Sequence, residues 1–123
     1  MKRNENATHK FLKQLLGPSV PITRQFHIKG PIIEKGEVVR EYLLVDFALT
    51  LGGQLILVEY QGGQHYKAVR KWGGKVALDS QKIRDKWLRK YCLKNGIKLI
   101  EIDGRKIRGK KIEAELKRKL KTP

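Results

Sequence analysis

The chain has 123 residues, of which 40% are hydrophobic, and its 28 Lys and Arg residues outnumber its 12 Asp and Glu residues, which gives a formal net charge of +16. This length and composition predict one globular domain over residues 1–123, and the lack of any run of about 18 apolar residues excludes a bilayer-spanning helix. The charge favours a polyanionic partner, most often a nucleic acid and less often an anionic membrane surface. With one cysteine, Cys92, and no apolar signal region near Met1, the sequence predicts a cytoplasmic protein in a reducing compartment, without an internal disulfide or a cysteine-based zinc cluster.

The first predicted element is a short helix from about Asn4 to Leu16. Its apolar residues recur at helical spacing, and Gly17 followed by Pro18 ends it. Glu5 falls in the first turn, where the helix dipole stabilises a carboxylate. The alternative role for Glu5 is to reach a metal site formed by a later part of the chain.

Three antiparallel strands are predicted next. The first covers residues 25–30, continued or bent at 31–33, and a charged turn follows it. Residues 38–51 and 55–61 then flank Gly52-Gly53, a dipeptide typical of a two-residue hairpin turn.

This hairpin places two acidic residues opposite each other. If Leu51 pairs with Gln54, the same register brings Asp46 opposite Glu59, with Cβ atoms about 5 Å apart. Like charges in that position repel, so a cation between them explains why both are present. Gln61 shares their face because side chains in a strand alternate with a period of two. Two carboxylates and an amide oxygen predict a site for a hard cation such as Mg²⁺, which Mn²⁺ would also fill.

Simpler interpretations of the acidic pair stay open. Asp46 could be an edge-strand residue, and Glu59 could mark the point where its strand reaches solvent. A three-residue turn would also place the two carboxylates on opposite faces of the sheet.

Residues 62–75 combine glycines, cations and aromatic residues, a composition untypical of a core element. In one interpretation this loop faces nucleic acid, with cations on phosphates and Tyr66 or Trp72 stacked on bases. In the other it is a solvated surface loop with one anchored aromatic residue. The candidate nucleic-acid-binding residues of this loop and the following helix are Lys67, Arg70, Lys71, Trp72, Lys75, Lys82, Lys86 and Arg89.

Asp79-Ser80 opens a second predicted helix, whose apolar stripe predicts that Trp87 and Cys92 face the sheet. A strand over residues 97–102 follows this helical crossover, so we expect it to run parallel to a hairpin strand. A basic helix over residues 107–120 completes the chain. The cations assigned to the remaining surface of the second helix are Lys82, Arg84, Lys86, Arg89, Lys90 and Lys94.

This order of elements, with Asp46 and Glu59-Tyr60-Gln61 on the three-strand meander, resembles the PD-(D/E)XK nuclease superfamily. More narrowly, the stretch from Glu59 to Tyr66, with Arg84-Asp85 and residues 91–102, is similar to small phage and bacterial endonucleases related to the very-short-patch repair enzymes. The resemblance covers residues 42 to 103, about half of the chain.

The resemblance implies an α/β (α+β) fold with a restriction-endonuclease-like core, in which an α-β-β-β-α-β mixed sheet is flanked by helices and a basic C-terminal helix is added. It implies a divalent-metal-dependent endonuclease that cleaves duplex, mismatched or branched DNA. By the same similarity Asp46 and Glu59 hold Mg²⁺, Gln61 takes the position of the superfamily's lysine, and His65 matches an additional histidine of the repair-like branch. The chain departs from the superfamily pattern at Val45, where the eponymous proline would stand, and at Gln61.

Phosphodiester hydrolysis is consistent with these residue types. A metal polarises a phosphoryl oxygen and lowers the pKa of the attacking water, which the Gln61 amide could orient. His65 is a candidate general base or acid, or else a loop histidine bonded to backbone. Lys82 or Lys86 is a further candidate for the cation that Gln61 does not supply.

Two other function classes stay open. One is a catalytically weak or inactive nucleic-acid-binding module derived from a nuclease, and the other is a basic RNA- or ribosome-associated protein. Cleavage of both DNA strands by one site per chain would favour a homodimer.

Overall fold

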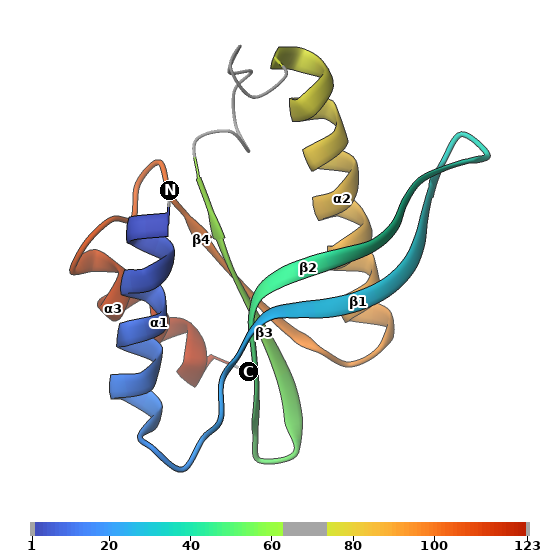
Figure 1. Ribbon diagram of the computed structural model, residues 1–123. Helices are drawn as coiled ribbons and strands as arrows, with labels where there is room; N and C mark the ends of the chain where they lie inside the picture. Colours follow the sequence, from blue (N-terminus) through green and yellow to red (C-terminus); the bar gives the residue numbers. More distant parts are fainter. Residues whose placement is uncertain (1, 63–73, 123) are drawn as a thin grey trace.

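The computed structural model describes residues 2–62 and 74–122, and it describes side chains for residues 3–62 and 79–122 (Figure 1). In chain order its elements are α1 (Lys2–Leu16), β1 (Thr23–Glu34), β2 (Glu37–Leu51), β3 (Gln54–Gln61), α2 (Gly74–Lys94), β4 (Lys98–Asp103) and α3 (Lys111–Lys121). The described chain is therefore of the mixed α+β class, with the predicted order of helices and strands. Over the same residues, none of the helices is both long and apolar enough to cross a membrane.

The four strands form one mixed sheet in the order β1-β2-β3-β4. The first three strands are antiparallel neighbours, whereas β4 lies parallel to β3. Both Gly52 and Gly53 have positive φ, 54° and 81°, which a two-residue hairpin turn of the favoured type requires. The register through Leu51↔Gln54 and the parallel fourth strand were both predicted from the sequence, and both are confirmed.

The second helix is longer than the sequence predicted. It begins at Gly74 rather than at Asp79, because Ala77 and Leu78 are good helix formers and extend it past Asp79-Ser80 towards the N-terminus. Lys75 therefore belongs to α2, and its assignment to a loop was wrong.

The last helix is shorter than predicted. It begins at Lys111 rather than at Ile107, because the Ile107 backbone N–H donates to the Asp103 carbonyl oxygen (2.8 Å) and closes a turn after β4.

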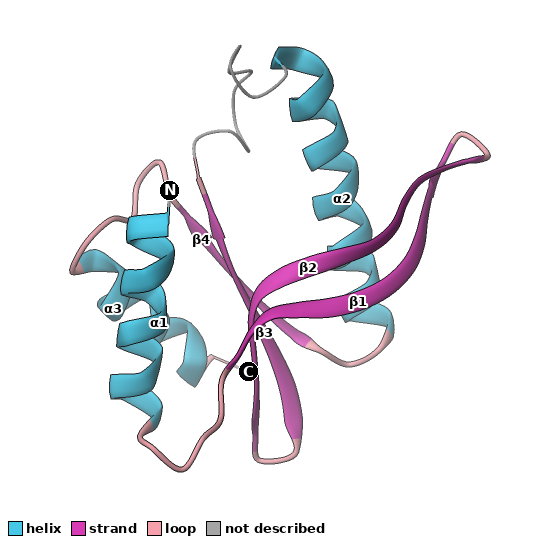
Figure 2. Ribbon diagram, viewed as in Figure 1, coloured by secondary structure: helices cyan, strands magenta, loops and turns pink. Residues whose placement is uncertain are grey.

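The helices cover opposite faces of the sheet, with α1 and α3 on one side and α2 on the other (Figure 2). The core against α1 and α3 contains Leu12, Phe47, Leu49, Ile56, Val58, Ile100, Ile102, Ile112 and Leu116. The core against α2 contains Ile28, Ile32, Leu43, Val45, Ala48, Leu57, Leu88 and Cys92. As predicted, Cys92 is a core residue, and Trp87 packs against the same cluster.

Strand β2 changes face at Asp46. Val45 packs in the core against α2, but Phe47, two residues later, packs in the core against α1 and α3. A regular strand would keep both residues on one face, since side chains alternate with a period of two. On the neighbouring strand Gln25 has a φ of 53°, between the pairs Arg24↔Phe47 and Phe26↔Val45. The irregularity therefore involves both strands, and Asp46 is the residue of β2 at which it occurs.

Candidate active site

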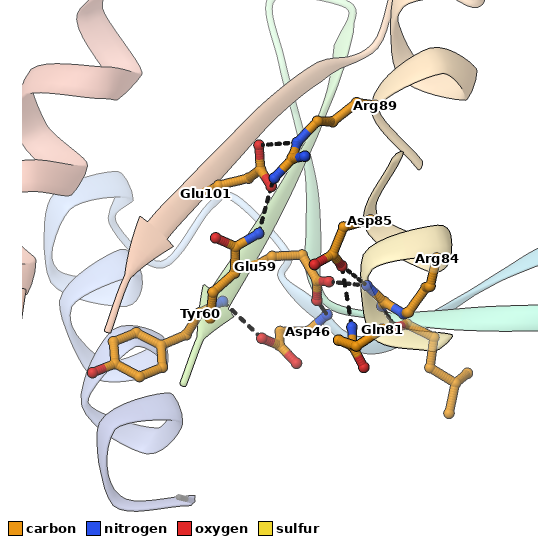
Figure 3. Close-up of polar contacts among 10 residues, drawn as sticks. Asp46, Glu59, Tyr60, Gln81, Arg84, Asp85, Arg89 and Glu101 are labelled. Atoms are coloured by element: carbon orange, nitrogen blue, oxygen red, sulfur yellow. Dashed lines mark hydrogen bonds and ion pairs between the residues drawn. The ribbon is translucent and has the colours of Figure 1, made fainter. Parts of the chain in front are cut away.

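Asp46 and Glu59 face each other from β2 and β3, where the regular ladder stops after the pair Phe47↔Val58 (Figure 3). The Asp46 backbone N–H donates to Glu59 Oε2 (3.0 Å), and the Tyr60 backbone N–H donates to Asp46 Oδ2 (2.8 Å). Each carboxylate thus accepts a hydrogen bond from the backbone of the other strand. The crossed bonds replace ladder hydrogen bonds and fix the two acidic side chains beside each other.

The acidic pair is held in a low-dielectric environment. The pKa of Asp46 is raised to about 7, first by burial and then by the nearby Glu59 carboxylate, while the hydrogen bond from the Tyr60 N–H lowers it. Glu59 is buried, with 4% exposure, and burial also raises its pKa, against the lowering effect of Arg84. Like charges that share a buried site do not both ionise easily, so a metal-free pair tends to retain a proton near neutral pH.

Among the described residues, Arg84 on α2 is the cation that contacts this pair. It has 6% exposure, and its Nη1 donates to Glu59 Oε1 (2.6 Å) and to Asp85 Oδ1 (3.1 Å), while Nη2 donates to the Leu44 carbonyl oxygen. Gln81 Nε2 also donates to Asp85 Oδ1 (3.1 Å), so α2 holds the network together (Figure 3).

The assignment of Arg84 to the helix surface was wrong. Arg84 precedes Leu88 by four residues and Cys92 by eight, and both of those side chains are buried against the sheet. This spacing places Arg84 on the buried stripe. This spacing is visible in the sequence, but Arg84 was assigned to the helix surface because it is charged.

Gln61 is buried, and its amide Nε2 donates to Glu101 Oε1 on β4. Arg89 binds the same carboxylate through Nε to Oε2 (3.0 Å) and Nη2 to Oε1 (2.8 Å). The Gln61 amide N–H is thus directed to β4, whereas Asp46 and Glu59 bond to each other's strands. Sequence reasoning missed Glu101, although a strand parallel to β3 in the observed register pairs it with Glu59.

Gly104 closes the end of β3 against the end of β4. Its backbone N–H donates to the Gln61 carbonyl oxygen (2.7 Å), and a Cβ at this position would collide with that oxygen and contact the Tyr60 ring. The Tyr60 hydroxyl in turn donates to the Ile107 carbonyl oxygen (3.1 Å). The C-terminal end of β3, which carries the site, is therefore held by close backbone contacts.

The remaining site candidates are placed as follows. Glu5 lies in the first turn of α1, accepts a hydrogen bond from Arg24 (2.9 Å), and contributes to the raised pKa of Asp46. Lys82 and Lys86 are exposed on α2. The candidates that lie outside the described residues are His65, Tyr66, Lys67, Arg70, Lys71 and Trp72.

The acidic pair can be compared with the needs of a divalent cation. Among residues 2–62 and 74–122, no group of three or more His, Cys, Asp or Glu side chains could hold a metal ion. Mg²⁺, however, keeps several waters and is commonly bound through one or two carboxylates together with substrate phosphates. Within the described part of the chain, Asp46 Oδ1 has no hydrogen bond, while both Glu59 oxygens accept one. The donor set therefore fits such a cation through Asp46, and Arg84 competes with the cation for Glu59.

Comparisons with known proteins leave the family open. No family model and no solved structure matches the chain. A similar protein is the uncharacterized protein 094L of Frog virus 3 (isolate Goorha), which is 49% identical over 47 residues. The matched segment is 37% of this chain and 30% of the viral protein, so the chain spans less than a third of that relative's length.

Proposed function

We propose that this protein is a divalent-metal-dependent DNA endonuclease of the PD-(D/E)XK type, which hydrolyses phosphodiester bonds at Asp46 and Glu59. The observation that carries the proposal is the crossed carboxylate pair, in which the buried Glu59 and the half-buried Asp46 are fixed together in a chain with a formal charge of +16. A basic surface attracts the phosphate backbone. Carboxylates repel phosphate, so their presence in such a basic chain is explained if they hold the cation needed for hydrolysis.

Asp46 and Glu59 would hold the metal, which when bound supplies Lewis-acid activation of a phosphoryl oxygen and of the attacking water. Asp46 has to lose its proton to do so, because a carboxylate binds metal in its ionised form. Arg84 keeps Glu59 oriented through the 2.6 Å ion pair and favours its ionised form. Gln61, tied to Glu101, fixes the end of β3, and His65 stays the proposed proton-transfer group.

A non-catalytic nucleic-acid-binding module is the second candidate function. It is favoured by the same ion pair, since the Arg84 guanidinium already neutralises Glu59 and the chain carries Gln61 where the superfamily has lysine. In that case Arg84 takes the place of the metal, and the chain binds DNA without cleaving it.

Nicking of supercoiled plasmid DNA separates the two functions. We expect wild-type protein to convert plasmid to open circles with Mg²⁺ or Mn²⁺ and not with EDTA. Asp46→Asn should abolish nicking while retaining DNA binding in a gel-shift assay. Glu113→Gln, which removes a carboxylate from α3 with the same change in charge, is the matched control and should nick normally. Equal nicking by Asp46→Asn, or none by purified wild type with either metal, would refute the endonuclease.

A further inference from the structure

The distal parts of β1 and β2 project from the body of the molecule past α2 (Figure 1). We call residues 29–44, which include this projection and its turn, the hairpin arm; within it Ile32 and Leu43 pack in the core against α2. One of its strands, β1, lies at the edge of the sheet, with β2 as its neighbour. The arm is therefore accessible along a strand edge and at its tip.

The hairpin arm exposes most of the large apolar side chains that lie on the described surface. Among residues with described side chains, six large hydrophobic residues are exposed, and five of them lie in the arm. They are Ile33, Val38, Val39, Tyr42 and Leu44. Ile33 pairs directly with Val38 across the two strands, so their side chains adjoin near the tip. Apolar surface gathered in one projecting element is typical of a binding surface, unlike scattered apolar residues.

The charge of the hairpin arm differs from that of the rest of the chain. The arm contains three basic residues and three acidic residues, so its formal net charge is zero. The basic residues are Lys29, Lys35 and Arg40, and the acidic residues are Glu34, Glu37 and Glu41. The whole formal charge of +16 therefore lies outside the arm. A polyanion would be attracted elsewhere, because its binding depends on neutralising phosphates with an excess of Lys and Arg.

We propose that the hairpin arm is a homodimer contact, in which the arm of a second copy of this chain packs against it about a two-fold axis. Two copies with a charge of +16 repel each other, and the neutral arm adds nothing to this repulsion. A two-fold interface must be complementary to itself, since residue i meets residue j and j meets i. Equal numbers of acidic and basic side chains, interspersed with exposed apolar ones, satisfy that condition.

Sedimentation velocity of the full chain, with a matched pair of variants, tests this contact. Val38→Lys adds a charge at an apolar arm residue, and Leu93→Lys adds the same charge at an apolar residue of α2 that is 85% exposed. Neither side chain is buried, so circular dichroism should show that both variants fold. We expect wild type and Leu93→Lys to sediment as dimers at about 100 µM protein, and the dissociation constant of Val38→Lys to rise at least about 10-fold, because its charge would be buried at the contact.

Salt provides a second readout. Raising the ionic strength from about 0.1 to 1 M shortens the Debye length from about 10 to 3 Å, so the wild-type dimer should become tighter as the repulsion between basic surfaces is screened. A monomeric wild type at high salt, or an unchanged Val38→Lys dimer, would overturn the proposal. The proposal would also be overturned if wild type is monomeric and Val38→Lys changes only its binding to DNA or to anionic vesicles. The arm would then contact a different partner.

Discussion

Strand β2 contributes both to the hairpin arm and to the acidic junction, by which we mean Asp46, Glu59 and Arg84. Both regions depart from the usual distribution of side chains, in which charges are exposed and apolar groups are buried. At the junction three ionisable side chains lie in a largely buried environment. On the arm Val38 and Tyr42 expose apolar surface to solvent. A buried charge and an exposed apolar patch are the two departures from ordinary burial that are most informative about function. In the two proposals, therefore, catalysis and association belong to separate parts of β2.

The largest expected effect is at the junction, when the buried ion pair loses its cation. Arg84→Met should lower the free energy of unfolding by about 3–5 kcal/mol, because it leaves Glu59 buried without its partner. Arg89→Met removes an exposed partner of Glu101 and should cost no more than about 1 kcal/mol. Urea unfolding of both variants checks the contrast, and Glu59→Gln in the Arg84→Met background should recover part of the loss. Equal losses for the two arginine variants would show that burial does not distinguish the two ion pairs.

The second expected effect is a dependence of stability on pH. The pKa of Asp46 is about 7 in the folded chain and near 4 in an unfolded one, so between these values the folded chain binds more protons. Stability in EDTA should therefore fall as pH rises from about 4 to 7, by up to about 1.4 kcal/mol per unit of pKa difference. Asp46→Asn should lose this contribution, and Glu113→Gln should retain it. Thermal unfolding across this range is the measurement, and parallel curves for Asp46→Asn and wild type would contradict the shifted pKa.

The hairpin could be predicted from the sequence because its information is local. Gly52-Gly53 fixes the turn, the turn fixes the register, and the register brings Asp46 to Glu59. The parallel fourth strand also followed from the length of the crossover. These features depend on neighbouring residues and on general connection rules.

The partners of the acidic pair were not predicted, because they come from distant segments. Arg84 is 25 residues from Glu59, and Glu101 reaches Gln61 from a strand 40 residues further along the chain. The change of face at Asp46 was missed as well, since Leu43, Val45, Phe47 and Leu49 read as one regular alternation. Only the tertiary packing of α2 against one side and of α1 and α3 against the other divides that series.

The smallest expected effect is on the arm. Val38 and Val45 lie on the same strand with exposures of 52% and 0%. Threonine is similar in size to valine, so substituting it at both positions separates the effect of burial from the effect of side-chain size. Val45→Thr should lower the free energy of unfolding by about 1–3 kcal/mol, because it buries a hydroxyl group. Val38→Thr in dilute protein should change it by no more than about 0.5 kcal/mol. Chemical unfolding gives both values, and a comparable loss at Val38 would mean that the arm is packed within the single chain.

Calorimetric titration of Mn²⁺ into the metal-free protein tests directly whether Asp46 and Glu59 form a cation site. We predict one site per chain in wild type and in Glu113→Gln, and loss of that site in Asp46→Asn. This variant removes the Asp46 carboxylate, whose Oδ1 has no hydrogen bond among the described residues. Undiminished Mn²⁺ binding by Asp46→Asn, or no binding by wild type, would contradict the account of Asp46 and Glu59 as a cation site.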